Sequence, residues 1–271
     1  MSEQYVVAEK PLILLEQVIS IARLIPSDLL WVFRGHANCD WDLLPSAGRK
    51  PHFVSSSPPD PSQPSSRKNP PPDLGRFNHW RDLASAYRQV LPQNDFECLA
   101  LAQHYGLPTR LLDFSSNILV ALYFACESDF DSDGCIFAFL PDLFIDPEIC
   151  SFYDIPESGI LRVRPFERRF LQQSAQLMYF KDPATPLRGK RQPAEMEEFR
   201  KAANLPDSSL IKFLIPKKSK VYHLNALERI GVSRSTLFPD LEGLSQQFVL
   251  NDVLDSLRDD LQTDSESLEK A

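Results

Sequence analysis

Apolar positions along this chain recur with two periods, one near 3.6 residues and one of two residues, which are typical of helices and strands. The helical period predicts helices over residues 12–24, 77–91, 96–105, 118–128, 166–173, 194–204 and 225–230. Short apolar or alternating runs predict strands over residues 30–34, 110–115, 134–140, 159–163, 176–180 and 209–215. The helices separate the strands without a regular strand–helix–strand repeat. This order predicts an α+β fold, a single domain whose mixed or antiparallel sheet is surrounded by helices.

The most informative polar stretch, residues 102–117, lies between two apolar helical runs. It concentrates ring, guanidinium, carboxylate, amide and hydroxyl side chains around Gly106 and Pro108. An unpaired buried polar group costs about 1–3 kcal/mol, so such a stretch needs a physical reason. Either these groups satisfy one another in a structural network, or they line a site.

Strand alternation orders the middle of this stretch. An extended 110–115 segment places Asp113 and Ser115 on one face, so the two side chains could act together beside a ligand. Ser115 could equally cap the following helix. We expect Ser116 to be the cap, with Asn117 in the first helical turn.

Four residues that precede the 110–115 segment in the sequence are further candidates for a binding site. Arg34 ends an apolar strand, and its guanidinium fork suits a phosphate or a carboxylate, while Gly35 would let a ligand approach the backbone. The alternative is a structural ion pair between Arg34 and Asp113. His104 and Tyr105 close a helix before Gly106, where a histidine also gains from the helix dipole without any functional role.

Charge and composition narrow the possible partners. The formal charge is −8, and residues 251–271 hold seven acids and two bases, which leaves −3 for the rest of the chain. A near-neutral body argues against a general nucleic-acid surface. Leucines at 254, 257 and 261 predict a short amphipathic helix fading into disorder in this acidic tail. The tail is interpreted as a solvated segment or, alternatively, as a peptide that binds a protein partner.

Residues 51–73 interrupt the periodic pattern with eight prolines and six serines. Proline lacks the N–H that helices and sheets require, so we expect a disordered insertion within the domain. A polyproline ligand for a protein partner is the alternative.

Cysteine usage and hydropathy indicate the compartment. The five cysteines are widely spaced and form no C-x-x-C motif, so we expect no metal, with Cys98 and Cys126 as reduced core residues. No stretch has the length and apolarity of a membrane span, and the first residues do not resemble a signal peptide. A cytoplasmic protein without a membrane partner is the expectation.

The sequence resembles the FRG domain family in several segments that occur in the same order. The first two are Phe33-Arg34-Gly35, followed by Trp41, Leu44-Pro45-Ser46 and Arg49, and the block from Leu99 to Ala125, in which Phe114 and Ser115 replace the family's common tryptophan and threonine. The later ones are Arg169 with Gln173, which are one helical turn apart and could hydrogen-bond each other, and the block from Thr236 to Leu244. This resemblance implies an FRG-like domain over residues 12–250. The family brings no firmly assigned activity with it.

A more distant resemblance is to the ADP-ribosyltransferases. The Arg34–Gly35 step is similar to their arginine-glycine step, and Ser115-Ser116 followed by Ala121 and Phe124 is similar to their serine strand and next helix. The resemblance implies that the arginine holds the phosphates of NAD, a serine braces the nicotinamide ribose, and a later glutamate stabilises the cationic transition state.

This chain departs from that pattern at the last position. Gln173 stands where the glutamate is expected, and a neutral amide cannot counter a positive charge. Loss of such electrostatic stabilisation commonly costs several kcal/mol in the barrier. Asp113 or Glu167 could replace it, or the pocket binds a nucleotide without that chemistry.

These arguments lead to one hypothesis and one alternative. The hypothesis is an FRG-domain protein with a nucleotide pocket, NAD as its candidate cofactor, and ADP-ribosyltransferase-like activity in an effector or defence role. The alternative is a non-catalytic ligand-sensing or protein-interaction module. The expected catalytic residues are Asp113, Ser115 and Gln173, and the expected substrate-binding residues are Arg34, Gly35, His104, Tyr105 and Arg110.

Overall fold

The computed structural model describes residues 5–25, 29–52, 70–87, 91–150, 155–164, 168–190, 197, 201 and 207–269. The strands are β1 (Val6–Val7), β2 (Val32–His36), β3 (Leu111–Ser115), β4 (Gly134–Phe139), β5 (Phe144–Ile145), β6 (Gly159–Leu161), β7 (Ala175–Tyr179) and β8 (Leu210–Ile215). The helices are α1 (Leu15–Leu24), α2 (Pro72–Ala84), α3 (Asp95–His104), α4 (Ile118–Cys126), α5 (Arg168–Gln172), α7 (Lys220–Arg229), α8 (Arg234–Leu237) and α9 (Leu241–Glu269). Two short 3-10 helices span Ser46–Gly48 and Lys217–Ser219.

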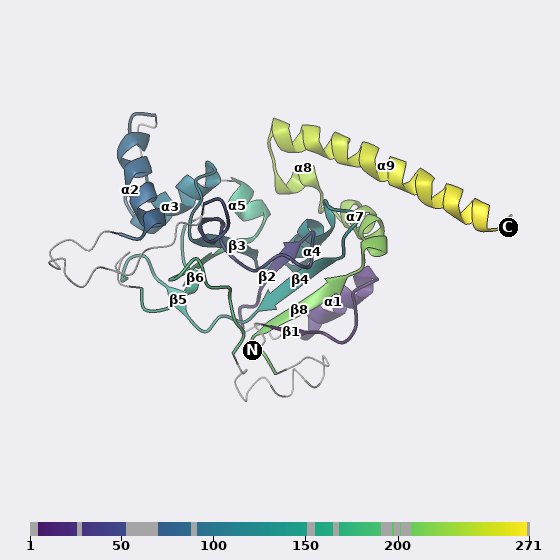
Figure 1. The fold of residues 1–271 in the computed structure, drawn as a ribbon, viewed down its shortest axis with the longest axis horizontal. Coiled ribbons are helices and arrows are strands. Elements are labelled where there is room, and N and C mark those ends of the chain that lie inside the picture. The colour runs from purple at the N-terminus through teal and green to yellow at the C-terminus, as the bar shows by residue number, and fades with distance from the viewer. Residues whose placement is uncertain are drawn as a thin grey trace.

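All of these strands belong to one sheet in the order β1-β8-β4-β2-β3-β7-β6-β5 (Figure 1). β1 is parallel to β8 and β5 is parallel to β6, whereas the other neighbouring pairs are antiparallel. Helices pack around this sheet, and α9 projects from the body toward the C-terminus (Figure 1). The predicted α+β fold with a mixed sheet is confirmed.

The centre of the sheet is nearly unpaired. β2 and β3 are neighbours, but their ladder has a single pair, Phe33 with Ser115. On its other side β2 pairs with β4 at every residue, and β3 does the same with β7. The two halves of the sheet are therefore well ordered, and they separate along the line between β2 and β3. We call this line the central seam.

The helix α4 lies against β2 beside the seam. Nearly all of its residues are apolar and buried, which is typical of a core helix. It approaches so closely that a Cβ atom on Gly35 would lie 1.9 Å from the carbonyl oxygen of Ala121. The sequence suggested that Gly35 makes room for a ligand. In the structure the missing side chain makes room for the backbone of α4.

Three buried clusters fill the two faces of the sheet. The first packs α1, α4 and α7 against β2, β4 and β8, and the second packs α2 and α3 against β3, β6 and β7. The third occupies the opposite face and includes Leu112 and Phe114, whose neighbours Leu111 and Asp113 point the other way. The predicted alternation along β3 is confirmed.

Three helices begin earlier than their patterns predict. α2 begins at Pro72, inside the predicted insertion, because proline is well tolerated in the first turn of a helix. α7 begins at Lys220, whose buried ammonium donates to the backbone oxygens of Ala37, Ser128 and Asp129 at 2.6–3.0 Å. α9 begins at Leu241, well before the predicted tail helix. Residues 53–69 of the insertion and most of the predicted helix at 194–204 lie outside the described residues.

Two further expectations concern cysteines and membranes. Cys98 and Cys126 are buried and carry free thiols, as the apolar pattern predicted. In the part of the chain that the structure describes, no helix is both long enough and apolar enough to cross a membrane.

Candidate functional site

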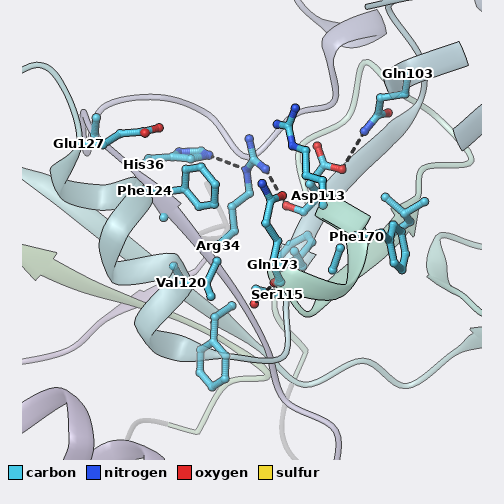
Figure 2. A pocket seen from close by; sticks show the side chains of 18 of the residues that line it. Arg34, His36, Gln103, Asp113, Ser115, Val120, Phe124, Glu127, Phe170 and Gln173 are labelled. Atoms are coloured by element: carbon cyan, nitrogen blue, oxygen red, sulfur yellow. Dashed lines mark hydrogen bonds between the residues drawn. The ribbon is translucent and has the colours of Figure 1, made fainter. Parts of the chain in front are cut away.

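A cavity of about 360 Å³ lies at the central seam. Its walls come from β2, β3, α3, α4 and α5 and from the segment after β2 (Figure 2). Six of the eight expected site residues line it: Arg34, Gly35, His104, Asp113, Ser115 and Gln173. Tyr105 and Arg110 are not among the residues of the wall. Residues that are distant in the sequence thus meet in one place.

The side chain of Arg34 crosses the seam. Its Nη1 donates to the backbone oxygen of Asp113 at 2.6 Å, and its Nε donates to Nε2 of His36 at 3.0 Å (Figure 2). Both acceptors are neutral groups. Burial lowers the pKa of Arg34 to about 10, so the guanidinium stays charged at neutral pH. Its Nη2 makes no hydrogen bond to any described residue and remains available.

His36 is a member of the site that the sequence reasoning did not select. Its side chain is only 3% exposed, and Nδ1 lies 3.3 Å from the backbone oxygen of Trp41. A neutral imidazole that donates from Nδ1 and accepts at Nε2 satisfies both contacts. Burial, together with the positive charge of Arg34, lowers the pKa of His36 to about 3. His36 therefore acts as a neutral support for the arginine.

Asp113, the middle residue of β3, lines the cavity. Gln103 on α3 donates to Asp113 Oδ1 at 2.9 Å (Figure 2). The hydroxyl of Thr109 donates to the Gln103 side chain. Asp113 is exposed, and its contact with Arg34 is made by the backbone oxygen. The carboxylate is consequently held in place by the amide of Gln103.

The hydroxyl of Ser115 makes hydrogen bonds to the backbone, which is a structural role. It donates to the backbone oxygen of Gln173 at 2.7 Å and accepts from the backbone N–H of Asn117 at 3.0 Å. Asn117, and not Ser116, caps α4 by accepting from Leu119 N–H at 2.9 Å, so the predicted cap was wrong. An Asn side chain reaches the second N–H of a helix as well as serine does, and its position directly before Ile118 decides the outcome.

Arg169 and Gln173 line the cavity from α5 and the turn after it. The Gln173 amide donates to the backbone oxygen of Leu237 at 3.2 Å. The guanidinium carbon of Arg169 lies 4.1 Å from the ring centroid of Phe238, a cation–π contact. The side chains of Arg169 and Gln173 therefore contact Leu237 and Phe238 at the end of α8. The expected hydrogen bond between the two residues is a backbone one, from the N–H of Gln173 to the oxygen of Arg169 at 3.0 Å.

A second arginine lies over the same phenylalanine. Arg234 is 3.9 Å from the Phe238 centroid and forms an ion pair of 2.7 Å with Glu127, which lines the cavity after α4. Burial raises the pKa of Glu127, while the charge of Arg234 opposes that shift. Sequence reasoning missed Glu127 and Arg234 because each lies in an ordinary surface-like context.

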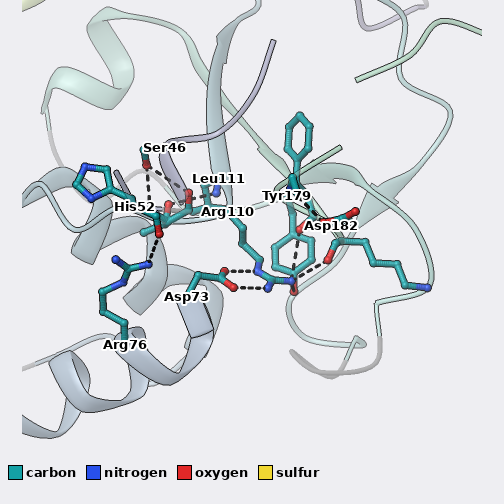
Figure 3. Close-up of polar contacts among 12 residues, drawn as sticks. Ser46, His52, Asp73, Arg76, Arg110, Leu111, Tyr179 and Asp182 are labelled. Atoms are coloured by element: carbon teal, nitrogen blue, oxygen red, sulfur yellow. Dashed lines mark hydrogen bonds and ion pairs between the residues drawn. The ribbon is translucent and has the colours of Figure 1, made fainter. Parts of the chain in front are cut away.

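Tyr105 and Arg110, the two expected site residues outside the cavity wall, have other surroundings. Tyr105 is 64% exposed, beside His104 at the end of α3. Arg110 is 3% exposed and forms a two-bond ion pair with Asp73 of α2, with both distances 2.7 Å (Figure 3). It also donates to the backbone oxygen of Lys181 at 3.0 Å. The charge of Arg110 is thus neutralised inside the fold.

Among the residues that the structure describes, no three His, Cys, Asp or Glu side chains form a group that could hold a metal ion.

Comparison with known proteins gives one match. The family model of the FRG domain matches residues 30–134, which include β2, α3, β3 and α4. No curated protein and no solved structure matches the chain. The matched range contains Arg34, His36 and Asp113, whereas Arg169, Gln173 and Phe238 lie beyond it.

The ion pair of Arg110 yields the first prediction. Replacement by Gln (Arg110→Gln) leaves Asp73 as an unpaired buried charge, so we expect a loss of about 3–5 kcal/mol in the free energy of unfolding. Urea denaturation followed by circular dichroism measures this loss. The matched control is Arg164→Gln, whose ion pair with Glu148 is highly exposed, and which should change stability by less than about 1 kcal/mol. Full stability of Arg110→Gln together with lost ligand binding would instead make Arg110 a ligand residue.

The second prediction concerns pH. The unfolded chain protonates His36 near its ordinary pKa of 6.5, whereas the folded chain keeps it neutral down to about 3. Between these values acid favours the unfolded state, so His36 removes up to about 1.4 kcal/mol of stability per pH unit as the pH falls. His36→Gln keeps an acceptor for Arg34 and should flatten this dependence.

Free energies of unfolding measured from pH 7 to pH 4, for wild type and for His36→Gln, test this predicted pH dependence. The buried His223, whose pKa burial also lowers, retains part of the slope in the variant. Exposed His79 supplies the control His79→Gln. An unchanged slope in His36→Gln would show that His36 titrates normally.

Proposed function

Because residues 30–134 form an FRG domain whose seam holds this cavity, we propose that the protein binds a nucleotide through its phosphate groups. The observation that carries the proposal is the kind of group that Arg34 contacts. Its hydrogen bonds go to an imidazole and a carbonyl, which are neutral, so its positive charge is left for a ligand. Arg110 provides the contrast, since Asp73 cancels its charge.

Other groups in the cavity support an anionic ligand. Arg49 and Arg169 also line the wall, so three guanidinium groups face Asp113 and Glu127 in a chain of net charge −8. Arg169 has the face of Phe238 as its partner and forms no ion pair with a described residue. One guanidinium group can donate two parallel hydrogen bonds to the oxygens of a phosphate. Arg34 and Arg169 are therefore the candidate phosphate-binding residues.

The cavity also offers surfaces for a flat ring. Trp41, which is 51% exposed, and Phe124 both line it. Aromatic side chains of this kind stack on bases and similar rings. A volume of about 360 Å³ lies in the range of roughly 300–1,000 Å³ that small-molecule sites occupy. NAD is the candidate ligand, because it combines two phosphates with two rings.

We further propose ADP-ribosyl transfer as the activity, with Asp113 as its carboxylate. In that reaction the bond between the ribose carbon and nicotinamide nitrogen breaks, nicotinamide leaves with the electron pair, and an acceptor nucleophile bonds to the same carbon. A carboxylate stabilises the positive charge that develops on the ribose. Asp113 fits better than Glu127, which is paired with Arg234, and Glu167 lies outside the described residues.

A non-catalytic sensing module is the second candidate. The observation that favours it is that the side chains of Ser115 and Gln173 already have hydrogen-bond partners in the fold. The Ser115 hydroxyl is bonded to a backbone oxygen, and the Gln173 amide is bonded to Leu237. Both groups therefore hold the fold together, and a reaction that needs them would have to break these bonds.

Nucleotide binding leads to a prediction for Arg34. Arg34→Lys keeps the charge but loses the planar fork, so we expect at least about tenfold weaker binding of NAD and ADP-ribose with little change in melting temperature. Isothermal titration calorimetry measures the affinities, and Arg164→Lys on the exposed surface is the control. If wild type binds neither compound at millimolar concentration and Arg34→Lys unfolds, Arg34 is purely structural.

A separate prediction distinguishes the enzyme from the sensor. In an enzyme, Asp113→Asn should retain NAD binding and lose nicotinamide release, because an amide cannot stabilise the positive charge. Chromatography of released nicotinamide measures turnover, and Asp131→Asn at an exposed position is the control. A wild-type protein that binds NAD and releases no nicotinamide, even with candidate acceptors added, is a sensor.

A further inference from the structure

The first turns of α9 carry an exposed apolar surface. Leu241 is 82% exposed, Leu244 45%, Phe248 65% and Val249 63%. Positions 241, 244 and 248 follow one side of a helix, and 249 lies beside them. We call these four residues the α9 stripe. Apolar side chains gathered on one helix face and bordered by polar residues are typical of an interaction site, whereas single scattered ones are ordinary.

The other side of the same helix is already occupied. Leu254 is 3% exposed and belongs to the main core cluster, against which Leu250 also packs. Gln247 accepts from the backbone N–H of Arg234 at 2.7 Å, which ties α9 to α8. The helix is therefore fixed to the body while the α9 stripe stays uncovered. A fixed stripe binds without the entropy cost of ordering the helix first.

The charge of α9 indicates what would cover this surface. Residues 241–269 contain eight acids and one base, a net charge of −7. Glu242 and Asp252 are exposed and adjoin the α9 stripe in the helix, and the other acids follow toward the C-terminus. Apolar contact and negative charge thus occur on one continuous element, and a partner must match both.

We propose that the α9 stripe is the docking site for a basic amphipathic helix of a partner protein. Such a helix would place apolar residues at i, i+3 or i+4, and i+7 on the stripe and direct lysine or arginine toward the acids of α9. A second copy of this chain would instead bring two helices of charge −7 together. An anionic lipid surface would repel them as well.

Two synthetic helical peptides test this proposal on the full chain. Both have the same leucine stripe, and their polar positions are all lysine in one and all glutamate in the other. We expect the lysine peptide to bind with a Kd on the order of micromolar and the glutamate peptide to bind at least about tenfold more weakly. Fluorescence anisotropy of labelled peptide measures both affinities, with no nucleotide present.

Variants separate stripe contact from general attraction between charges. The double variant Phe248→Ser with Val249→Ser should lose at least about tenfold in affinity for the lysine peptide, because aromatic anchors dominate such contacts. Leu83→Ser, at a 54% exposed position on α2, is the matched control and should bind like wild type. Circular dichroism establishes that each variant is folded.

Several outcomes would overturn the proposal. These are equal binding of the two peptides, no binding of the lysine peptide, or binding that the double variant retains. Sedimentation of wild type as a dimer that the double variant abolishes would assign the stripe to a second copy. Binding to phosphatidylserine vesicles that the double variant abolishes would assign it to a membrane.

Discussion

The single pair between β2 and β3 is the constraint on which the site depends. A fully paired sheet would place backbone hydrogen bonds where the cavity lies. Phe33 and Ser115 hold the two halves together at one point, and beyond it the strands separate. The strong ladders of β2 with β4 and of β3 with β7 keep each half in place. The opening therefore lies between two fully paired halves of the sheet, and Arg34 spans it.

Two arginines show how the surroundings of a charge decide its use. Arg34 lies in β2 and Arg110 directly precedes β3, and Arg34 is half-buried whereas Arg110 is buried. Arg110 meets the carboxylate of Asp73, and this buried pair attaches α2 to the body (Figure 3). Arg34 meets a neutral imidazole and a carbonyl oxygen. Arg34 is half-buried and its hydrogen bonds go only to neutral groups, which makes it the better candidate for an anionic ligand.

The C-terminal segments complete the cavity from outside the matched family range. The ring of Phe238 contacts the guanidinium groups of both Arg169 and Arg234, and Arg234 pairs with Glu127 of the cavity wall. The ring of Phe238 also meets that of Phe124 on α4, with centroids 6.1 Å apart. Four residues of the wall, Phe124, Glu127, Arg169 and Gln173, thus contact the α8 segment. α8 is also hydrogen-bonded to α9, so the helix that carries the α9 stripe and the cavity wall are both attached to α8.

The sequence by itself determined the core strands, the helices α3 and α4, and the shared face of Asp113 and Ser115, because local periodicity reports which side of an element is buried. It did not determine which arginine is neutralised, since Asp73 reaches Arg110 from 37 residues away. Nor did it select His36 or Glu127, whose roles arise from contacts with Arg34 and Arg234. Periodicity depends on neighbours in the chain, whereas charge pairing and cavity shape depend on residues that only the tertiary structure brings together.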